Sequence, residues 1–343
     1  MKVFNIDDLR DTYRPLSESH KGQNGKLLIV GGSHLFHAAS LWAFTIASRI
    51  VDMVFYSSVA ENNELVAAGK REFRNGIIVS RDDLDRYVEE ANVVLIGPGM
   101  VRSEGLKVDS EKLQIKYKSL REINALADEG EQSYYLTQYL LEKYPKKKWV
   151  IDAGALQMME LAWLAQLKEH VLLTPHQGEF ERLKSKIKDE RLRMQLENQK
   201  LEDEVALFAK AYNCTVLLKG HEDVVCPPAG RTGPPAGRTG PPAGRTGPPA
   251  GRTGPPAGRA GSTSGCVVVR GGNAGMTKGG TGDVLAGLAG ALACNNDLWT
   301  AAKLASYFNK RAGDSLLEKV GYYFNASDLA DEIPRVMREC LVA

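Results

Sequence analysis

A glycine-rich segment followed directly by an apolar run is the feature that most restricts how this chain can fold. Residues 271–283 read GGNAGMTKGGTGD, and residues 284–293 read VLAGLAGALA. A glycine-rich loop that opens an apolar helix leaves backbone N–H groups unpaired at the positive end of the helix dipole, where anions bind. Glycine also lets the backbone approach a phosphate closely and adopt positive φ. The segment therefore predicts an anion site at the start of a buried helix.

Asp283 stands where this loop becomes helix. A carboxylate beside a bound phosphate is repelled unless a metal, a substrate proton or a general-base role compensates. The alternative is that residues 279–282 form only a tight turn and that Asp283 caps the helix. A short glycine-loop match is weak by itself, but here a second glycine cluster directly precedes it. The longer run favours the anion site.

Strands and helices alternate along most of the chain. Short apolar segments predict strands over 26–30, 53–58, 77–80, 92–96, 148–152, 170–173 and 214–218, and a hairpin from 223–226 and 266–269. Helical patterns cover 38–50, 131–141, 181–212, 298–317 and 327–341. This alternation predicts an α/β fold with a mainly parallel central sheet and helices on both faces. Ligands bind beyond the carboxyl ends of such strands, where G-G-S (31–33) and G-P-G (97–99) lie, although a purely structural tight turn is the alternative for 31–33.

Composition restricts the partners. A hydrophobic fraction of 43% and a charged fraction of 25% are those of a globular protein, and a net charge of +2 argues against a nucleic-acid binder. The most apolar segment, 38–60, carries Arg49 and Asp52, so it predicts helix and strand rather than a membrane span. The first eight residues do not resemble a signal peptide. We expect a cytoplasmic protein without nucleic-acid or membrane partners.

Residues 227–261 break the pattern with five Pro-Pro-Ala-Gly-Arg-Thr-Gly-type heptads, which contain no acidic, aromatic or branched aliphatic residue. Such a tract cannot bury a core, so we expect a disordered insert at a hairpin tip. Cys226 and Cys266 would face each other at the base of that hairpin. The five cysteines show no metal-ligand spacing, so zinc is not expected. We expect them to be reduced thiols, and a Cys226–Cys266 disulfide not to form in a reducing cytosol.

Residues 272–287 resemble the signature of the nucleotide-dependent NAD(P)H-hydrate dehydratases, repair enzymes with a ribokinase-like fold. Further matches follow the order of that family: S-H-K-G (19–22), G-G-S (31–33), G-P-G (97–99), T-P-H-x-G-E (174–179) and K-G (219–220). The chain departs from the usual pattern at Ala38 (usually glycine), Gly154 (usually an acid) and Gln157 (usually asparagine). The resemblance implies a single ribokinase-like domain over 1–343, interrupted by the insert at 227–261. Because only about 25 residues precede the first predicted strand, we expect no epimerase domain there.

The resemblance also implies an activity, namely dehydration of the S-form of NADH hydrate and NADPH hydrate with ADP or ATP as phosphoryl donor and Mg²⁺ as cofactor. Asp283 would be the general base, and Glu179 would lie near the metal. The substrate contacts would be Ala39, Gly99 and His176, together with Asp283. The nucleotide contacts would be Lys219, Gly220, His221, Glu222, Asp223, Gly279, Gly280, Thr281 and Gly282. We also expect a homo-oligomer.

Several alternatives stay open. The G-x-G-D sequence is shared with ribokinase-superfamily kinases of small alcohols such as hydroxyethylthiazole or a pyrimidine-vitamin precursor. An inactive scaffold that displays the basic repeat is a third possibility, against which the intact Asp283 counts. His176 could be an ordinary surface residue at a strand end. Asp152, which follows a strand, could belong to a metal or water network or could only cap the next helix.

Overall fold

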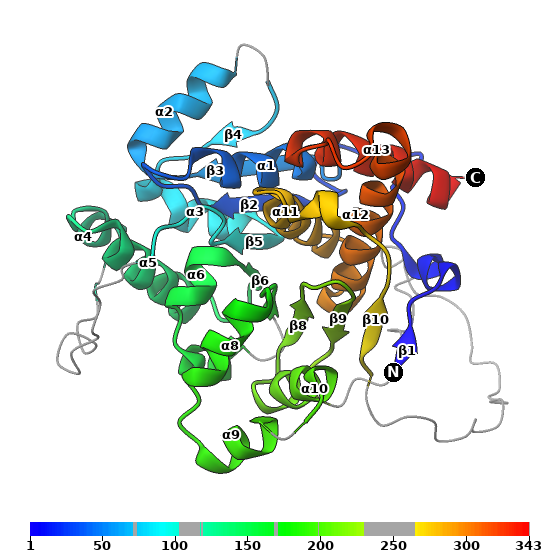
Figure 1. The fold of residues 1–343 in the computed structure, drawn as a ribbon. Coiled ribbons are helices and arrows are strands. Elements are labelled where there is room, and N and C mark those ends of the chain that lie inside the picture. Colours follow the sequence, from blue (N-terminus) through cyan, green and yellow to red (C-terminus); the bar gives the residue numbers. More distant parts are fainter. Residues whose placement is uncertain are drawn as a thin grey trace, which may run out of the picture.

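A single ten-stranded sheet organises the chain in this computed structural model, which describes residues 1–70, 74–102, 117, 119–167, 171–197, 199–229 and 265–342 (Figure 1). The strand order is β1-β10-β9-β8-β7-β6-β5-β2-β3-β4. The strands are β1 (Lys2–Val3), β2 (Lys26–Val30), β3 (Met53–Ser57), β4 (Ile77–Ile78), β5 (Val93–Ile96), β6 (Lys148–Ile151), β7 (Val171–Leu173), β8 (Thr215–Leu218), β9 (Asp223–Cys226) and β10 (Val267–Val269). Among the strands of the described residues, only β9 runs antiparallel to its neighbours, so the prediction of a mainly parallel sheet is confirmed.

Helices cover both faces of this sheet, as expected. They are α1 (His37–Ala47), α2 (Ala60–Gly69), α3 (Leu84–Glu90), α4 (Leu120–Asn124), α5 (Glu129–Lys143), α6 (Ala153–Met158), α7 (Leu164–Leu167), α8 (Gln177–Ser185), α9 (Glu190–Glu197), α10 (Leu201–Ala211), α11 (Thr281–Ala293), α12 (Leu298–Val320) and α13 (Ala326–Val342). In β2, Leu27 and Ile29 point into a core formed with α1, α11, α12 and α13. Leu28 points into a second core with α3, α5, α8 and α10. The two cores follow from the period of two along a strand.

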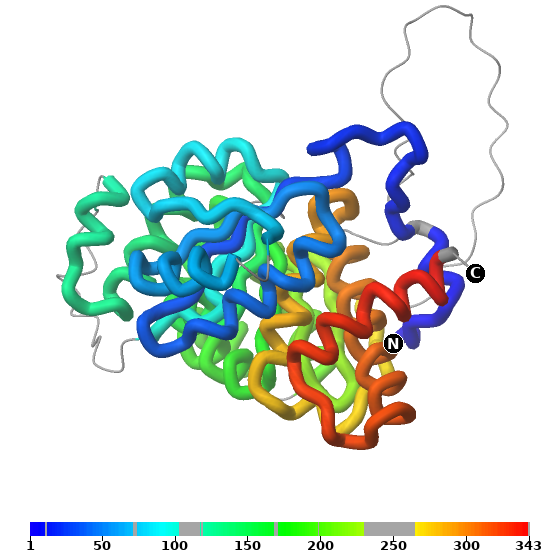
Figure 2. Tube along the Cα trace, turned by 90° about the horizontal axis from the view of Figure 1, so that it is seen from above, coloured from blue at the N-terminus to red at the C-terminus, as the bar shows by residue number. Residues whose placement is uncertain are grey.

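The C-terminal helices lie on one side of the molecule. Figure 2 shows α13 in red beside α12 in orange, and both pack against the same core as α11. α11 is the apolar run predicted to begin at the glycine loop, and its residues from Val284 to Ala293 are all buried. A helix that is apolar on every side must be enclosed, so the anion loop is fixed to the protein core.

Some elements differ from the predictions. The charged stretch 181–212 forms parts of three helices, α8, α9 and α10, rather than one helix or a hairpin of two. β1 was not predicted, because two exposed residues give no apolar pattern; Lys2 and Val3 pair with Val267 and Val268. The part of the repeat from 230 to 261 lies outside the described residues, so its predicted disorder stays a prediction.

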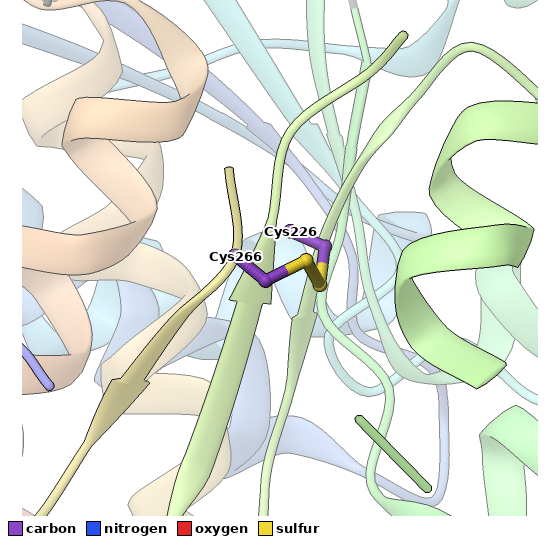
Figure 3. The surroundings of a disulfide bond; sticks show 2 residues. All are labelled: Cys226 and Cys266. Carbon is purple, nitrogen blue, oxygen red and sulfur yellow. A yellow bond between two sulfur atoms is a disulfide. The ribbon is translucent and has the colours of Figure 1, made fainter. Parts of the chain in front are cut away.

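The hairpin of β9 and β10 is closed by a disulfide between Cys226 and Cys266, with a Cα–Cα distance of 4.2 Å (Figure 3). The prediction that these residues face each other is confirmed, and the prediction that they stay reduced is wrong. Because Val225 pairs with Val267, the two cysteines next to them are held together by the register of the strands. Both side chains are buried, which keeps dissolved thiols from reaching the sulfur atoms. The prediction relied on the redox compartment and not on this geometry.

Within the described part of the chain, each helix is too short or too polar to cross a membrane.

Candidate active site

Three neighbouring strands end in polar side chains that meet at one edge of the sheet. Asp152 follows β6, Thr174 follows β7 and Lys219 follows β8. The Lys219 Nζ lies 2.9 Å from Asp152 Oδ1 and 4.0 Å from Glu179 Oε2. The Thr174 hydroxyl donates to the same Asp152 oxygen at 2.8 Å. Asp152 is buried and the Lys219 side chain is 17% exposed, so a partly buried ammonium group holds two carboxylates at the carboxyl ends of the strands, where ligands bind in such sheets.

Asp283 adds a third carboxylate from the first turn of α11. A Cβ built on Gly282 would lie 3.6 Å from Lys219 Nζ, so this ammonium group lies next to the first turn of α11. Burial and the charge of Asp152 raise the pKa of Asp283 to about 7, although Lys219 acts in the opposite direction. A carboxylate with such a pKa can exchange a proton near neutral pH. We call Asp152, Glu179, Lys219 and Asp283 the charged centre.

Lys219 stays charged within this centre. Burial works to lower its pKa, but the carboxylates of Asp152 and Glu179 outweigh burial, and the pKa is raised above the ordinary value. A buried charge is tolerated only when it is paired. The centre therefore presents a fixed cation to an incoming anion.

The loop before α11 has a shape that requires glycine. Gly280 is the N-cap residue with φ +95°, and a Cβ there would lie 2.3 Å from the ring of Trp42. The Thr281 hydroxyl donates to the carbonyls of Met276 and Lys278 at 2.7 and 2.9 Å, which closes the turn. The Thr281 N–H donates to the Lys278 carbonyl at 3.4 Å. Because the N-cap glycine makes no side-chain hydrogen bond to the helix, the N-terminal end of α11 is not covered by a cap and can receive an anion. This geometry favours the anion site over a simple tight turn.

His176 and Glu179 form a reciprocal cap at the start of α8. His176 Nδ1 accepts the backbone N–H groups of Gly178 at 3.0 Å and Glu179 at 3.3 Å. Glu179 Oε2 accepts the N–H of His176 at 2.9 Å, and Oε1 accepts the Gln157 side chain at 2.9 Å. With Nδ1 used as an acceptor, a neutral His176 carries its proton on Nε2, and the side chain is 59% exposed. It is a helix cap that also offers a donor to a ligand.

The acidic side chains alone do not form a metal cage. Among the residues that the structure describes, no group of three or more His, Cys, Asp and Glu side chains is arranged to hold a metal. Mg²⁺ commonly binds through one or two carboxylates together with nucleotide phosphates. Asp152 and Glu179 are the two carboxylates that converge here, with one oxygen of each 2.9 and 4.0 Å from Lys219 Nζ.

A second cluster lies where β2 and β5 end. A Cβ built on Gly99, whose φ is +71°, would lie 2.7 Å from the carbonyl oxygen of Phe36 and 3.1 Å from Ala39 Cβ. A Cβ on Gly32 would lie 2.2 Å from Asn62 Nδ2. We call Gly32, Ala39 and Gly99 the neutral cluster. The structure thus brings together Ala39 and Gly99, which are 60 positions apart in the sequence.

Buried neutral side chains support this cluster. The Tyr56 hydroxyl accepts from Asn62 Nδ2 at 2.8 Å and shares a hydrogen bond of 2.8 Å with the Ser40 hydroxyl. Asn62 also donates to the Ser58 hydroxyl at 2.9 Å. Satisfied buried polar networks make a site rigid.

The two clusters border the same region. A Cβ built on Gly97 would lie 1.8 Å from the carbonyl oxygen of Asp152, and one on Gly287 of α11 would lie 2.5 Å from the Ala43 Cα of α1. The turn after β5 therefore touches the turn after β6, and α1 packs directly on α11. A ligand on the neutral cluster would lie next to the charged centre.

The other nucleotide residues predicted from the sequence form a third group. The N–H of Gly220 donates to Asp223 Oδ1 at 2.9 Å, and Glu222 forms a 2.8 Å ion pair with Arg270. This pair joins the segment after β8 to the segment after β10. Lys310 of α12 contacts both segments. Sequence reasoning did not single out Lys310, because a lysine within a long helix gives no signal of its own.

The turn after β6 explains why this chain has Gly154 where the resembled family usually has an acidic residue. A Cβ on Gly154 would lie 2.1 Å from the carbonyl oxygen of Met100, so this backbone occupies the space that a side chain would need. Ala153 has φ +43°, an uncommon conformation for a residue with a side chain, and such strain gathers at functional sites. The acid usual at position 154 cannot fit here, and Asp152 remains the carboxylate of this turn.

Comparisons with known proteins agree with this geometry. The family model described as NAD(P)H-hydrate dehydratase matches residues 27–247 and 260–335. The ADP-dependent (S)-NAD(P)H-hydrate dehydratase of Nitrosopumilus maritimus is 30% identical over 327 residues, covering 94% of this chain and 91% of that protein. The bifunctional NAD(P)H-hydrate repair enzyme Nnr of Methanocaldococcus jannaschii is 28% identical over 96% of this chain, which spans 52% of that enzyme.

Solved structures share the fold. A ribokinase-like superfamily protein of Enterococcus faecalis gives a TM-score of 0.69 at 20% identity, covering 99% of this chain and 96% of that one. The ADP/ATP-dependent NAD(P)H-hydrate dehydratase of Bacillus subtilis, co-crystallised with ATP/Mg²⁺, gives 0.66 at 19% identity, covering 99% and 98%. The ribokinase-like fold predicted from the sequence is confirmed.

Proposed function

The chain belongs to the NAD(P)H-hydrate dehydratase family, and from this premise we propose that it dehydrates the S-forms of NADH hydrate and NADPH hydrate, with ADP or ATP as phosphoryl donor. The hydrate's ring hydroxyl is a poor leaving group. Phosphorylation turns it into a good one, the electron pair of the ring nitrogen expels phosphate, and a proton leaves the adjacent carbon. The products are the reduced dinucleotide, inorganic phosphate and a nucleotide that is one phosphate shorter.

The observation that carries this proposal is the placement of Asp283. It lies at the anion loop, its pKa is raised to about 7, and the cation of Lys219 is held beside it by Asp152. Asp283 removes the hydroxyl proton as general base. The amides of residues 279–282 stabilise the charge on the phosphoryl group in transit.

The remaining residues bind and orient. Ala39 and Gly99 form the floor for the hydrate, and His176 donates from Nε2. Lys219 and residues 220–223 hold the nucleotide. Mg²⁺, when bound, neutralises phosphate charge, and Glu179 with Asp152 would hold it. We also propose that the protein works in the cytoplasm as a homo-oligomer.

The test is an assay with purified protein, NADH hydrate, Mg²⁺ and either ADP or ATP. The near-ultraviolet absorbance of the reduced nicotinamide should rise only when a nucleotide is present, and the two nucleotides show which donor is preferred. A flat trace from folded protein that still binds nucleotide would contradict the proposal. It would favour a kinase of small alcohols, whose shared G-x-G-D ends at Asp283.

A further inference from the structure

A lysine on α12 connects the two segments that we assign to the nucleotide. Lys310 is 5% exposed. Its Nζ donates to the carbonyl oxygens of Gly220 and His221, each at 3.0 Å, and to that of Gly271 at 3.3 Å. The first two belong to the segment after β8, and the third belongs to the glycine loop after β10. One ammonium group therefore spans two segments that are about 50 positions apart in the sequence.

A buried carboxylate balances this cation. Asp223 Oδ1 lies 3.2 Å from Lys310 Nζ, and Asp223 is itself buried. The same carboxylate accepts the N–H of Gly220 at 2.9 Å and the hydroxyl of Ser306 at 2.7 Å. Ser306 lies one helical turn before Lys310 on the same face of α12. Hydrogen bonds between charged groups and their partners are stronger than neutral ones, so this pair fixes the 219–223 segment to the helix.

The same face of α12 also holds the glycine loop. Asp314, one turn after Lys310, accepts the N–H of Gly272 at 3.1 Å. Gly271 and Gly272 have φ values of +109° and +77°, and a Cβ on Gly272 would lie 3.3 Å from Lys310 Cγ. The loop thus begins against Lys310 and ends at Asp283.

We propose that Lys310 is a positioning residue for the nucleotide: it fixes residues 219–223 against the loop 271–283, so that Lys219 and the loop amides meet the phosphates of one nucleotide together. This inference rests on the proposed function. It does not require Lys310 to touch the ligand.

The far end of the same hairpin is already fixed without Lys310. Cys226 and Cys266 join β9 and β10 covalently at the end away from the glycine loop. Loss of Lys310 should therefore change the spacing of the two nucleotide segments while the hairpin stays formed. A purely structural lysine would instead affect all ligands and stability alike.

The experiment compares Lys310→Met with Lys303→Met. Lys303 is a buried lysine about two turns earlier on α12, with its Nζ 3.7 Å from the centre of the Trp299 ring. Calorimetry measures the Kd of ADP and ATP with Mg²⁺, and the hydrate assay gives kcat and both KM values. In Lys310→Met we expect the Kd and KM of the nucleotide to rise about tenfold or more, with the KM of the hydrate unchanged. Lys303→Met should leave the nucleotide Kd at the wild-type value.

A second variant controls for the case in which Lys310→Met does not fold. Lys310→Met leaves Asp223 buried without its cation, and such an orphan charge is strongly destabilising. The double variant Lys310→Met/Asp223→Asn removes that charge, and its reference is the wild type, because Asp223→Asn alone would leave Lys310 as an unpaired buried cation. The double variant should bind nucleotide more weakly than its reference, and Lys310→Arg should recover part of the affinity.

Two results would overturn the inference. One is a wild-type nucleotide Kd in Lys310→Met, or an equal Kd in the double variant and its reference. The other is a parallel rise in the KM of hydrate and nucleotide. The proposed function is read separately from the wild-type hydrate assay, because the nucleotide Kd tests Lys310 even if no hydrate is turned over.

Discussion

The charged centre and the neutral cluster are both built on glycine turns at the carboxyl ends of parallel strands, yet they differ in what supports them. The charged centre holds three carboxylates around the single ammonium group of Lys219, and one of these carboxylates, Asp283, has a pKa raised to about 7. The neutral cluster rests on uncharged hydroxyl and amide groups, which leave no room for a side chain at Gly32, and on the Phe36 carbonyl, which leaves none at Gly99.

Because of this difference, we expect the two regions to have different roles in the reaction. Electrostatic groups in a preorganised site change the barrier of a reaction, whereas close packing decides which ligand shape is admitted. Changes in the charged centre should therefore act on the rate and its pH dependence. Changes in the neutral cluster should act on the affinity for the hydrate.

The largest effect is expected for Asp283→Asn. The amide keeps the shape of the side chain but cannot accept the hydroxyl proton, so kcat should fall by about a hundredfold to ten-thousandfold. The Kd of ADP or ATP should stay close to the wild-type value, because the loop amides and Lys219 remain. Single-turnover assays and calorimetry measure the two quantities. Retained turnover would remove Asp283 from the role of base.

The same variant makes a prediction about stability. The folded-state pKa of Asp283 is about 7, above the ordinary value of 3.8. A raised pKa means that the wild type loses stability as pH rises from the unfolded-state pKa through the folded-state pKa. Asparagine does not titrate, so the Tm advantage of Asp283→Asn over wild type should grow between pH 4 and 7 and then level off. A Tm difference independent of pH would contradict the environment assigned to Asp283.

A smaller effect is expected for Asp152→Asn. The charge of Asp152 raises the pKa of Asp283, so its removal should lower that pKa and move the acid limb of the kcat profile to lower pH. In the wild type this limb should lie near pH 7, because a base must be deprotonated to act. Asparagine can still accept from Lys219 and Thr174. A profile that stays in place or moves to higher pH would show that another group controls the limb.

The strands that carry both regions, and the glycine loop at Asp283, could be predicted from the sequence, and individual elements show why. β2 and β5 are short apolar runs that end in glycine, so their position and the ligand-binding edge followed from pattern alone. The loop before α11 was recognisable because only glycines permit its close contacts, as at Gly280 beside Trp42. Features that depend on neighbouring residues in the sequence, such as these strands and this loop, can therefore be predicted from the sequence.

What could not be predicted depends on contacts between distant segments. The ion pair of Lys219 with Asp152 joins residues 67 positions apart, and Lys310 reaches carbonyl groups about 90 and 39 positions away. No spacing rule connects such residues. The disulfide was judged from the compartment, whereas the register of β9 and β10 decides it. The raised pKa of Asp283 also arises only after folding, because burial causes it.

Ala39→Val tests the role of the neutral cluster in binding the hydrate. Ala39 Cβ already lies 3.1 Å from a Cβ built on Gly99, so two added methyl groups should reduce the space for the hydrate. Overpacking of this kind costs about 1–3 kcal/mol, which corresponds to a KM for the hydrate raised about fivefold to 150-fold. The Kd of the nucleotide and the pH profile should not change. A change in kcat or in the pH limb with an unchanged hydrate KM would show that the two regions do not divide the work.

The smallest effect on catalysis is expected for Cys226→Ala/Cys266→Ala, which removes a constraint outside both regions. The bridge closes a ring with a sequence separation of 40, so its loss should lower the free energy of unfolding by about 4 kcal/mol. Turnover should not change, because Lys310 and Asp223 hold the end of the hairpin that faces the charged centre. Denaturant titration and the hydrate assay measure both, with Cys214→Ala as the control for truncation of a buried cysteine. Lost turnover in a folded double variant would mean that the geometry of the charged centre depends on the Cys226–Cys266 disulfide, and that side-chain contacts alone do not set it.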